Sequence, residues 1–188
     1  WDVLPDDRKR YEAKRMAVYG GMVAAMDFHI GRLIDHLKTT GQYDNTLFVF
    51  TSDNGTEVSG APDPDHVRAR FLVEGQGYTS EYKTLGLKGS FNSISPSFAS
   101  ASASPLAFYK FYAGEGGLRV PLIIAGQSVL NKGELNHALS HVTDITPTIL
   151  AVAGVEAPTG RFAGRPIEAM IGRDLMPIIR GDAERVYA

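Results

Sequence analysis

Cysteine is absent from all 188 residues. Its absence excludes a disulfide framework, a thiolate-ligated zinc site and a thiol nucleophile within this sequence. No apolar run approaches the roughly 20 residues that a membrane-spanning helix needs, and the longest candidates are residues 46–50 and 120–125. The formal net charge is only -2 and there is no basic block, so we expect neither a nucleic acid nor a membrane as a partner.

The residues that are present are those of an ordinary globular protein. Hydrophobic residues make up 44% of the chain and charged residues 21%, close to the averages for folded domains. A chain of this length can form one medium-sized domain with a hydrophobic core, or a piece of a larger domain. Its organisation therefore has to be inferred from local patterns.

Residues 1–55 are predicted to form a helix and a strand that ends in a polar loop. Pro5-Asp6-Asp7 suits the start of a helix, and Gly41 suits the position just past its end. Gly20-Gly21 weakens the middle of this helix and allows a kink there. Apolar residues at spacings of three and four predict one apolar stripe along it. The stripe consists of Met16, Tyr19, Val23, Met26, Ile30, Leu33 and Leu37.

The strand is predicted at Thr46–Thr51, which is nearly all apolar, as expected of a strand buried on both faces of a parallel sheet. It ends in Ser52-Asp53-Asn54-Gly55. A helix, a short turn, a buried strand and a polar loop make half of an α/β unit. The sequence therefore predicts an α/β fold with a mostly parallel sheet flanked by helices.

The remaining chain divides into two further regions. Residues 56–114 have weak periodicity and a Ser/Ala-rich stretch at 90–104, which predicts a long insertion. Residues 115–188 are predicted to form a strand-helix unit and a tail, with a strand at 120–125. Thr143 or Asp144 suits the start of that helix and Gly154 its end.

Asp53 and Asn54 are the first candidate site, because ligands of α/β sheets bind outside the carboxyl ends of strands. A carboxylate beside an amide offers hard oxygen ligands that suit Ca²⁺ or Mg²⁺. Asp-Asn-Gly is also a common turn sequence, and the tripeptide alone favours that simpler interpretation. Two residues cannot fill the coordination sphere of Ca²⁺, so further ligands would have to come from elsewhere.

Lys110, shortly before Gly114-Glu115-Gly116-Gly117, is the second candidate. A lone lysine is usually a solvated side chain, but it can also place a positive charge against a tetrahedral anion such as sulfate or phosphate. Arg68, Arg70 and Lys88 could contact the same anion, although nothing in the spacing selects one. Glu115 and Arg119 are interpreted as a structural ion pair that supports a non-helical turn. His141, three residues before Asp144, is interpreted as a loop histidine beside a helix cap and not as half of a metal pair.

Several segments together resemble the type I sulfatase family, over nearly the whole chain. Each segment alone is weakly diagnostic, but their order and spacing are those of the family. The run from Lys88 to Pro121 looks most like the bacterial arylsulfatases. The segments are residues 10–19, 30–34, 50–55, 88–91, 105–110, 115–121 and 142–150.

The resemblance implies an alkaline phosphatase-like α/β fold and the hydrolysis of sulfate esters. Sulfatases of this family use a formylglycine, made from Cys or Ser in a C/S-x-P-x-R motif, and a divalent cation, usually Ca²⁺. Within that pattern Asp53 and Asn54 match metal ligands, and Lys110 matches the catalytic lysine that contacts the substrate sulfate. The compartment stays open, since such enzymes occur in the bacterial cytoplasm and in the periplasm.

This sequence departs from the family pattern in one important respect. It contains no C/S-x-P-x-R motif, because Ser95-Pro96 and Ser104-Pro105 lack the intervening residue. We therefore expect the chain to be the C-terminal half of an arylsulfatase, with an incomplete sheet and half an active site. On this interpretation it is inactive alone, and its partners are a small-molecule sulfate ester and the N-terminal half of the same enzyme. The alternatives are a phosphoesterase or phosphonate hydrolase of the same superfamily, and a non-catalytic interaction module.

Overall fold

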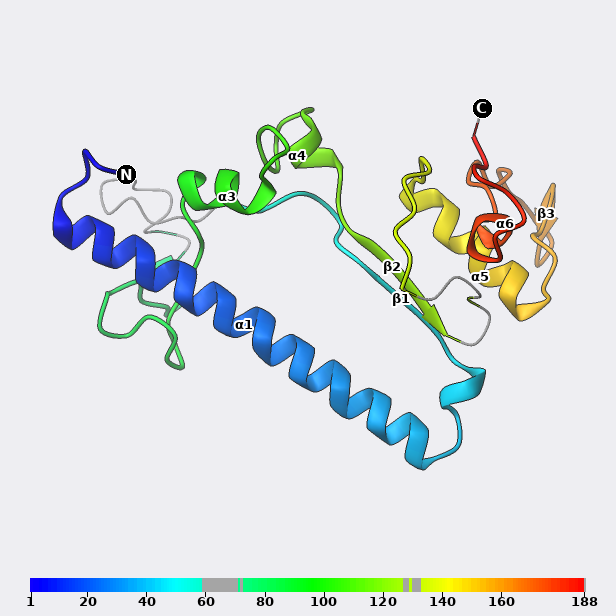
Figure 1. The fold of residues 1–188 in the computed structure, drawn as a ribbon, viewed down its shortest axis with the longest axis horizontal. Helices are drawn as coiled ribbons and strands as arrows, with labels where there is room; N and C mark the ends of the chain where they lie inside the picture. Colours follow the sequence, from blue (N-terminus) through cyan, green and yellow to red (C-terminus); the bar gives the residue numbers. More distant parts are fainter. Residues whose placement is uncertain (59–70, 72, 127–128, 130–132, 188) are drawn as a thin grey trace. The chain divides into compact units, whose positions relative to one another are not determined.

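The computed structural model describes residues 1–58, 71, 73–126, 129 and 133–187 (Figure 1). The chain divides into two compact units. Unit 1 consists of Trp1–Thr39 and Thr51–Leu122, and unit 2 consists of Thr40–Phe50 and Ile123–Ala188. The helices of the described residues are α1 (Asp6–Thr39), η1 (Tyr43–Asn45), α3 (Pro96–Ala103), α4 (Glu115–Leu118), η2 (Val142–Asp144), α5 (Ile145–Ala153) and α6 (Met176–Ile179). The strands are β1 (Leu47–Thr51), β2 (Leu122–Gly126), β3 (Arg161–Phe162) and β4 (Arg165–Pro166).

Helix α1 is continuous from Asp6 to Thr39 (Figure 1). Its predicted ends are confirmed, with Asp6 and Asp7 in the first turn and Gly41 just beyond the end at φ 69°. No break occurs at Gly20-Gly21. The predicted apolar stripe is not buried along its length, since Met26 is 44% exposed and Leu33 52%.

A buried ion pair anchors the first half of α1 in unit 1. The Arg15 side chain is 1% exposed, and its Nη1 donates to both carboxylate oxygens of Glu12 at 3.1 and 3.2 Å. Arg15 Nε also donates to the carbonyl of Ser93, while Asn92 Nδ2 donates to the Arg15 carbonyl at 3.1 Å. Burial lowers the pKa of Arg15, against the opposing effect of the Glu12 carboxylate. This network fastens the chain around residue 93 to α1.

The predicted insertion contains a helix that the weak periodicity did not indicate. α3 begins with Pro96 at its first position, and the Ser95 hydroxyl accepts a hydrogen bond from the Phe98 N–H at 3.4 Å. A serine followed by proline is a regular helix start, so the signal was present in the sequence. Ile94 and Ala99 are 3% and 0% exposed, which places this part of the insertion in the apolar core of unit 1.

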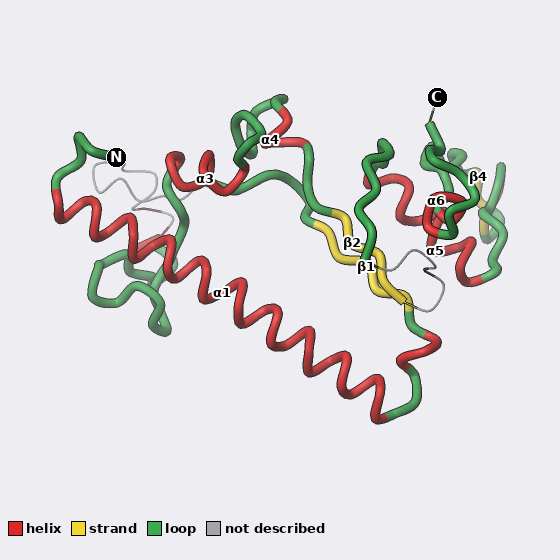
Figure 2. The backbone as a smooth tube through the Cα atoms, viewed as in Figure 1, coloured by secondary structure: helices red, strands yellow, loops and turns green. Residues whose placement is uncertain are grey.

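Unit 2 contains two small sheets and helix α5. β1 and β2 pair in one two-stranded sheet (Figure 2), and β3 pairs with β4 antiparallel. The predicted strand at Thr46–Thr51 is confirmed as β1, but it is mostly half-buried, and Phe50 is 37% exposed. α5 ends at the predicted Gly154, which has φ 67°. None of the described helices combines the length and apolar character needed to cross a membrane.

Candidate functional site

The loop after β1 carries the predicted metal ligands. The Ser52 hydroxyl donates to the Asn54 carbonyl at 2.9 Å, which closes a tight turn around Asp53. Asp53 is exposed and Asn54 is half-buried. Both readings of the sequence are therefore compatible with this loop: it is a turn, and it presents a carboxylate and an amide at the end of a strand.

Gly55 brings this loop into backbone contact with α4. The Gly55 N–H donates to the Gly117 carbonyl at 3.0 Å. A Cβ atom added at Gly55 would lie 1.9 Å from the Gly116 carbonyl oxygen, so only glycine fits this approach. Gly116 and Gly117 are themselves buried. The contact fixes the loop after β1 against a segment about 60 residues further along the chain.

Lys110 lies beside the same loop. Its backbone N–H donates to the Thr56 carbonyl at 3.1 Å, two residues after Asn54. Its ammonium forms an ion pair with the Glu57 carboxylate, and the Lys110 side chain remains 33% exposed. The structure therefore brings the segment of Lys110 next to the segment that follows Asp53 and Asn54.

The turn at Glu115-Gly116-Gly117-Leu118 is helical, which corrects the sequence interpretation. The two glycines argued against a helix, yet residues 115–118 form the single turn α4. The Gly116 N–H donates to the Ala107 carbonyl at 2.8 Å, and the contact requires a residue without a side chain. The predicted ion pair between Glu115 and Arg119 is confirmed at 3.3 Å.

Sequence reasoning missed Glu57 and the conformation of the Lys110 loop. Nothing local marks Glu57 as the partner of a lysine 53 positions later, because the contact depends on how the chain folds back. Phe108 and Phe111 both have positive φ angles, 68° and 80°, which no pattern of sequence spacing predicts for phenylalanine. Of the other candidate anion contacts, Lys88 is an exposed turn residue, and Arg68 and Arg70 lie outside the described residues.

The donor set at the end of β1 fits part of a divalent-cation site. Asp53 supplies a carboxylate and Asn54 an amide carbonyl, both hard oxygen donors of the kind that Ca²⁺ and Mg²⁺ prefer. Within the part of the chain that the structure describes, no three His, Cys, Asp or Glu side chains gather around a potential metal position. The two predicted ligands can therefore hold a cation only together with other oxygen donors.

Asp144 in unit 2 has a structural role. It is 0% exposed, and its Oδ2 accepts from the His141 N–H at 2.7 Å. Its Oδ1 accepts from the Arg173 N–H at 2.8 Å and from the Tyr187 hydroxyl. Burial opposes ionisation, but these hydrogen bonds outweigh it and lower the pKa of Asp144. His141, interpreted as a loop histidine beside a helix cap, is itself the N-cap of η2, and its ring accepts from the Thr143 N–H.

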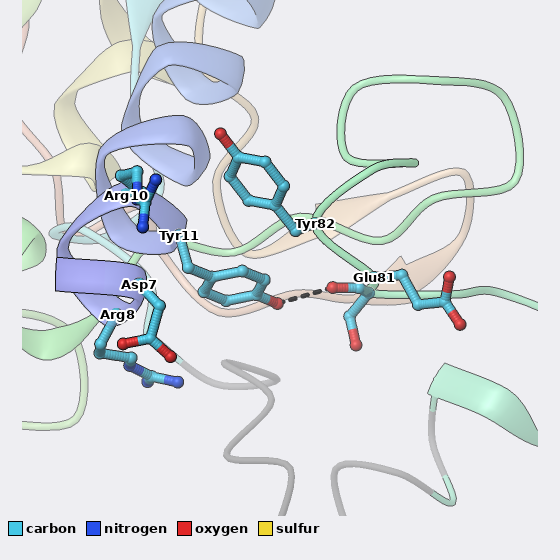
Figure 3. A pocket seen from close by; sticks show the side chains of 7 residues that line it. Asp7, Arg8, Arg10, Tyr11, Glu81 and Tyr82 are labelled. Carbon is cyan, nitrogen blue, oxygen red and sulfur yellow. Dashed lines mark hydrogen bonds between the residues drawn. The ribbon is translucent and has the colours of Figure 1, made fainter. Parts of the chain in front are cut away.

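A cavity of about 540 Å³ lies elsewhere in unit 1, between α1 and residues 80–82 (Figure 3). The Tyr11 hydroxyl at its wall donates to the Ser80 carbonyl at 2.7 Å. Asp53, Asn54 and Lys110 do not line it. The predicted site residues therefore belong to a surface loop cluster and not to this cavity.

Comparison with known proteins assigns the family. A family model described as Sulfatase matches residues 3–155, and the chain belongs to the sulfatase family. The predicted family, within the alkaline phosphatase-like superfamily, is thereby confirmed. The chain is 33% identical over 184 residues to an arylsulfatase of Klebsiella aerogenes, covering 95% of this chain and 38% of that protein. It is 36% identical over 167 residues to an uncharacterized sulfatase of Schizosaccharomyces pombe, covering 89% and 30%.

A solved structure supports the fold. The chain resembles Ps i-CgsB, crystallised in complex with k-i-k-neocarrahexaose, with a TM-score of 0.53 and 27% identity. The match covers 94% of this chain and 27% of that one. This chain thus spans at most 38% of the length of the relatives described above.

Proposed function

We propose that this chain supplies part of the active site of a sulfuric ester hydrolase of the arylsulfatase type. Asp53 and Asn54 hold a divalent cation, Ca²⁺ in this proposal, and Lys110 contacts the sulfate group of the substrate. The substrate is a small-molecule sulfate ester, with no role for a nucleic acid or a membrane. β1 and β2 belong, in this proposal, to a larger, mostly parallel sheet flanked by helices.

The observation that carries this proposal is the close association of two segments far apart in sequence. The Lys110 N–H is bonded to the Thr56 carbonyl, and the Gly55 N–H to the Gly117 carbonyl. These bonds hold the Lys110 segment against the loop of Asp53 and Asn54. Membership of the sulfatase family gives the association of these two segments, which carry a carboxylate, an amide and an ammonium, its chemical meaning in this proposal.

Each side chain has a distinct task in the proposed reaction. The Asp53 carboxylate and the Asn54 carbonyl orient the cation, which when bound polarises the sulfate oxygens. The Lys110 ammonium donates hydrogen bonds to a sulfate oxygen, where negative charge grows as the ester bond breaks. Glu57 holds the Lys110 side chain toward the loop and so positions its ammonium.

The nucleophile has to come from other residues. This sequence has neither a cysteine nor a Ser-x-Pro-x-Arg segment from which a formylglycine can be made. We propose that another part of the same enzyme, its N-terminal half, supplies the nucleophile and the remaining metal ligands, and that these 188 residues alone are inactive. Purification of the isolated chain and assay with 4-nitrophenyl sulfate tests that point, and turnover would contradict it.

The function is tested on the full-length protein with matched esters. Its kcat/KM is measured for 4-nitrophenyl sulfate and 4-nitrophenyl phosphate, with and without removal of divalent cations by a chelator. We expect the sulfate ester to be the better substrate and the chelator to abolish turnover until Ca²⁺ is restored. A clear preference for the phosphate ester would favour a phosphoesterase of the same superfamily.

The Lys110→Met variant tests the proposed sulfate contact. It keeps much of the length of the side chain and removes its charge, so kcat for 4-nitrophenyl sulfate should fall about 10²-fold. Lys83→Met, which changes an exposed lysine of the same unit, is the matched control and should change kcat less than about twofold. Equal rates for the two variants would remove Lys110 from the site.

The Glu57→Gln variant tests the positioning role of that carboxylate. The pair is partly exposed, so the loss is modest: kcat/KM should fall about fivefold, consistent with a pair that contributes up to about 1 kcal/mol. Glu57→Asp should recover part of the loss. Glu115→Gln, which breaks the exposed pair with Arg119, is the control. A higher kcat/KM in Glu57→Gln would instead show that Glu57 competes with sulfate for Lys110.

A further inference from the structure

Aromatic side chains surround Lys110 on the loop that carries it. Phe108 is 53% exposed, Phe111 70% and Tyr112 47%. The Lys110 ammonium nitrogen lies 5.4 Å from the centre of the Phe111 ring. The rings of Phe108 and Tyr112 stack with their centres 5.0 Å apart. We call Phe108, Phe111 and Tyr112 the aromatic platform, which is a largely apolar surface beside the Lys110 ammonium.

The backbone of the platform is strained. Phe108 has φ 68° and Phe111 has φ 80°, a left-handed conformation that is uncommon for bulky residues. Glycine adopts the same conformation without a steric penalty. Strain of this kind concentrates at binding and catalytic sites. Large rings at two positions that suit glycine therefore indicate that the rings themselves are used.

Two residues of the platform, Phe108 and Tyr112, pack closely against the segment of α4. A Cβ atom on Gly114 would lie 2.9 Å from the Phe108 ring, and one on Gly117 would lie 2.3 Å from the Tyr112 carbonyl oxygen. The Tyr109 and Tyr112 rings meet edge to face at 5.2 Å. The Phe108 and Tyr112 rings, which already stack on each other, therefore lose less conformational entropy on ligand binding than unpacked rings would.

We propose that the aromatic platform binds the organic group of the substrate, and that this group is an aryl ring. The proposal rests on the proposed function, since the contact of Lys110 with sulfate is what brings an ester to this loop. An aryl sulfate joins an anionic head to a flat apolar body, which match the ammonium and the rings beside it. A sulfated sugar carries several hydroxyl groups, and the platform offers them only the Tyr112 hydroxyl as a side-chain partner, because the two phenylalanine rings have no hydrogen-bonding group.

The test uses the full-length protein with Phe111→Ala and Phe111→Gly. KM is measured for 4-nitrophenyl sulfate, and the competitive inhibition constant is measured for inorganic sulfate, which has no organic group. We expect KM to rise about tenfold in both variants, the loss of one aromatic contact, while the inhibition constant for sulfate stays within about twofold. Phe111→Gly should reach this result without a lower melting temperature, because glycine relieves the left-handed strain.

Further variants separate binding from folding. Phe111→Tyr keeps the ring and should keep the wild-type KM, whereas Leu87→Ala removes an apolar side chain that is 63% exposed in the same unit and should leave KM unchanged. An unchanged KM in Phe111→Gly would contradict the proposal that the aromatic platform binds the substrate, and it would leave the proposed sulfatase function intact. A parallel rise in the inhibition constant for sulfate also overturns the platform, as does wild-type preference for D-glucosamine 6-sulfate over 4-nitrophenyl sulfate. Absence of turnover with every sulfate ester overturns the function and the platform together.

Discussion

Replacing Asp144 by asparagine is expected to destabilise the protein by about 3–5 kcal/mol at neutral pH. The carboxylate is fully buried and accepts hydrogen bonds from the His141 N–H, the Arg173 N–H and the Tyr187 hydroxyl. Asparagine replaces one acceptor oxygen by an NH₂ group. That group cannot accept a hydrogen bond, so at least one of the three donors loses its acceptor. Chemical unfolding of wild type and variant, followed by circular dichroism, measures the difference.

This destabilisation should depend on pH in a defined direction. The pKa of Asp144 is lowered in the folded protein, so the unfolded state binds more protons and acidification favours unfolding. The stabilisation by the ionised carboxylate is complete above the ordinary aspartate pKa of about 4. It is lost as pH falls through the lowered value. The gap between wild type and Asp144→Asn should therefore narrow in acid, and a gap that widens would contradict the proposed role of the charge.

Tyr187→Phe serves as the graded control for the same cluster. It removes one of the three donors and leaves the carboxylate and both backbone N–H bonds in place. We expect a loss of about 1–1.5 kcal/mol, the usual contribution of a single hydrogen bond. A loss as large as that of Asp144→Asn would show that the variants disrupt packing and not the carboxylate's hydrogen bonds.

Replacing Glu12 by glutamine is expected to cost about 3–5 kcal/mol, because it leaves the buried Arg15 charge without its counter-ion. The Arg15 side chain is 1% exposed and that of Glu12 4%. Asp6→Asn is the matched control on the same helix: it breaks a pair with Lys9 at the same i,i+3 spacing, but Asp6 is 90% exposed. That variant should lose less than about 1 kcal/mol.

The double variant Glu12→Gln/Arg15→Met shows whether the loss of stability in Glu12→Gln comes from an unpaired buried charge or from lost packing. If the cost comes from an unpaired buried charge, removal of that charge should recover part of the stability. Additive losses would instead show that the two side chains contribute independently through packing. Thermal unfolding of the wild type, the two single variants Glu12→Gln and Arg15→Met, and the double variant gives the four stabilities of this double-mutant cycle.

Local patterns predicted the elements whose ends are marked by specific residues. The acidic first turn and Gly41 gave both ends of α1, because dipole and left-handed preferences act within one turn of helix. Gly154 likewise ended α5. The apolar periodicity of α1 did not predict which of its residues are buried, because the buried residues are the charged Glu12 and Arg15. Periodicity identifies a helix face, but partners from distant segments decide which part of that face is covered.

The sequence predicted which residues belong to the candidate site, but it did not predict how those residues are arranged in space. Asp53, Asn54 and Lys110 were selected by strand position and by family resemblance. Two contacts could not be predicted, because each forms only when the chain folds back over some 55 to 60 residues. They are the ion pair of Glu57 with Lys110 and the backbone contact of Gly55 with α4. Glycines that looked like helix breakers at 116 and 117 are used for close approach in a helical turn. Their small size, and not their flexibility, explains their presence.

The main-chain registration of Gly55 against α4 has a practical consequence for redesign. Because the contact is made by peptide groups, substitutions at Glu57, Phe108 or Phe111 should leave the hydrogen bond between Gly55 and Gly117 in place, and a library at these positions tests which esters the proposed site accepts. Libraries at Gly55, Gly116 and Gly117 should return only glycine, because a Cβ atom at any of them would meet backbone atoms at less than 3.0 Å. If the proposed function holds, variation aimed at other esters is therefore confined to side chains beside this contact and excluded from the glycines that form it.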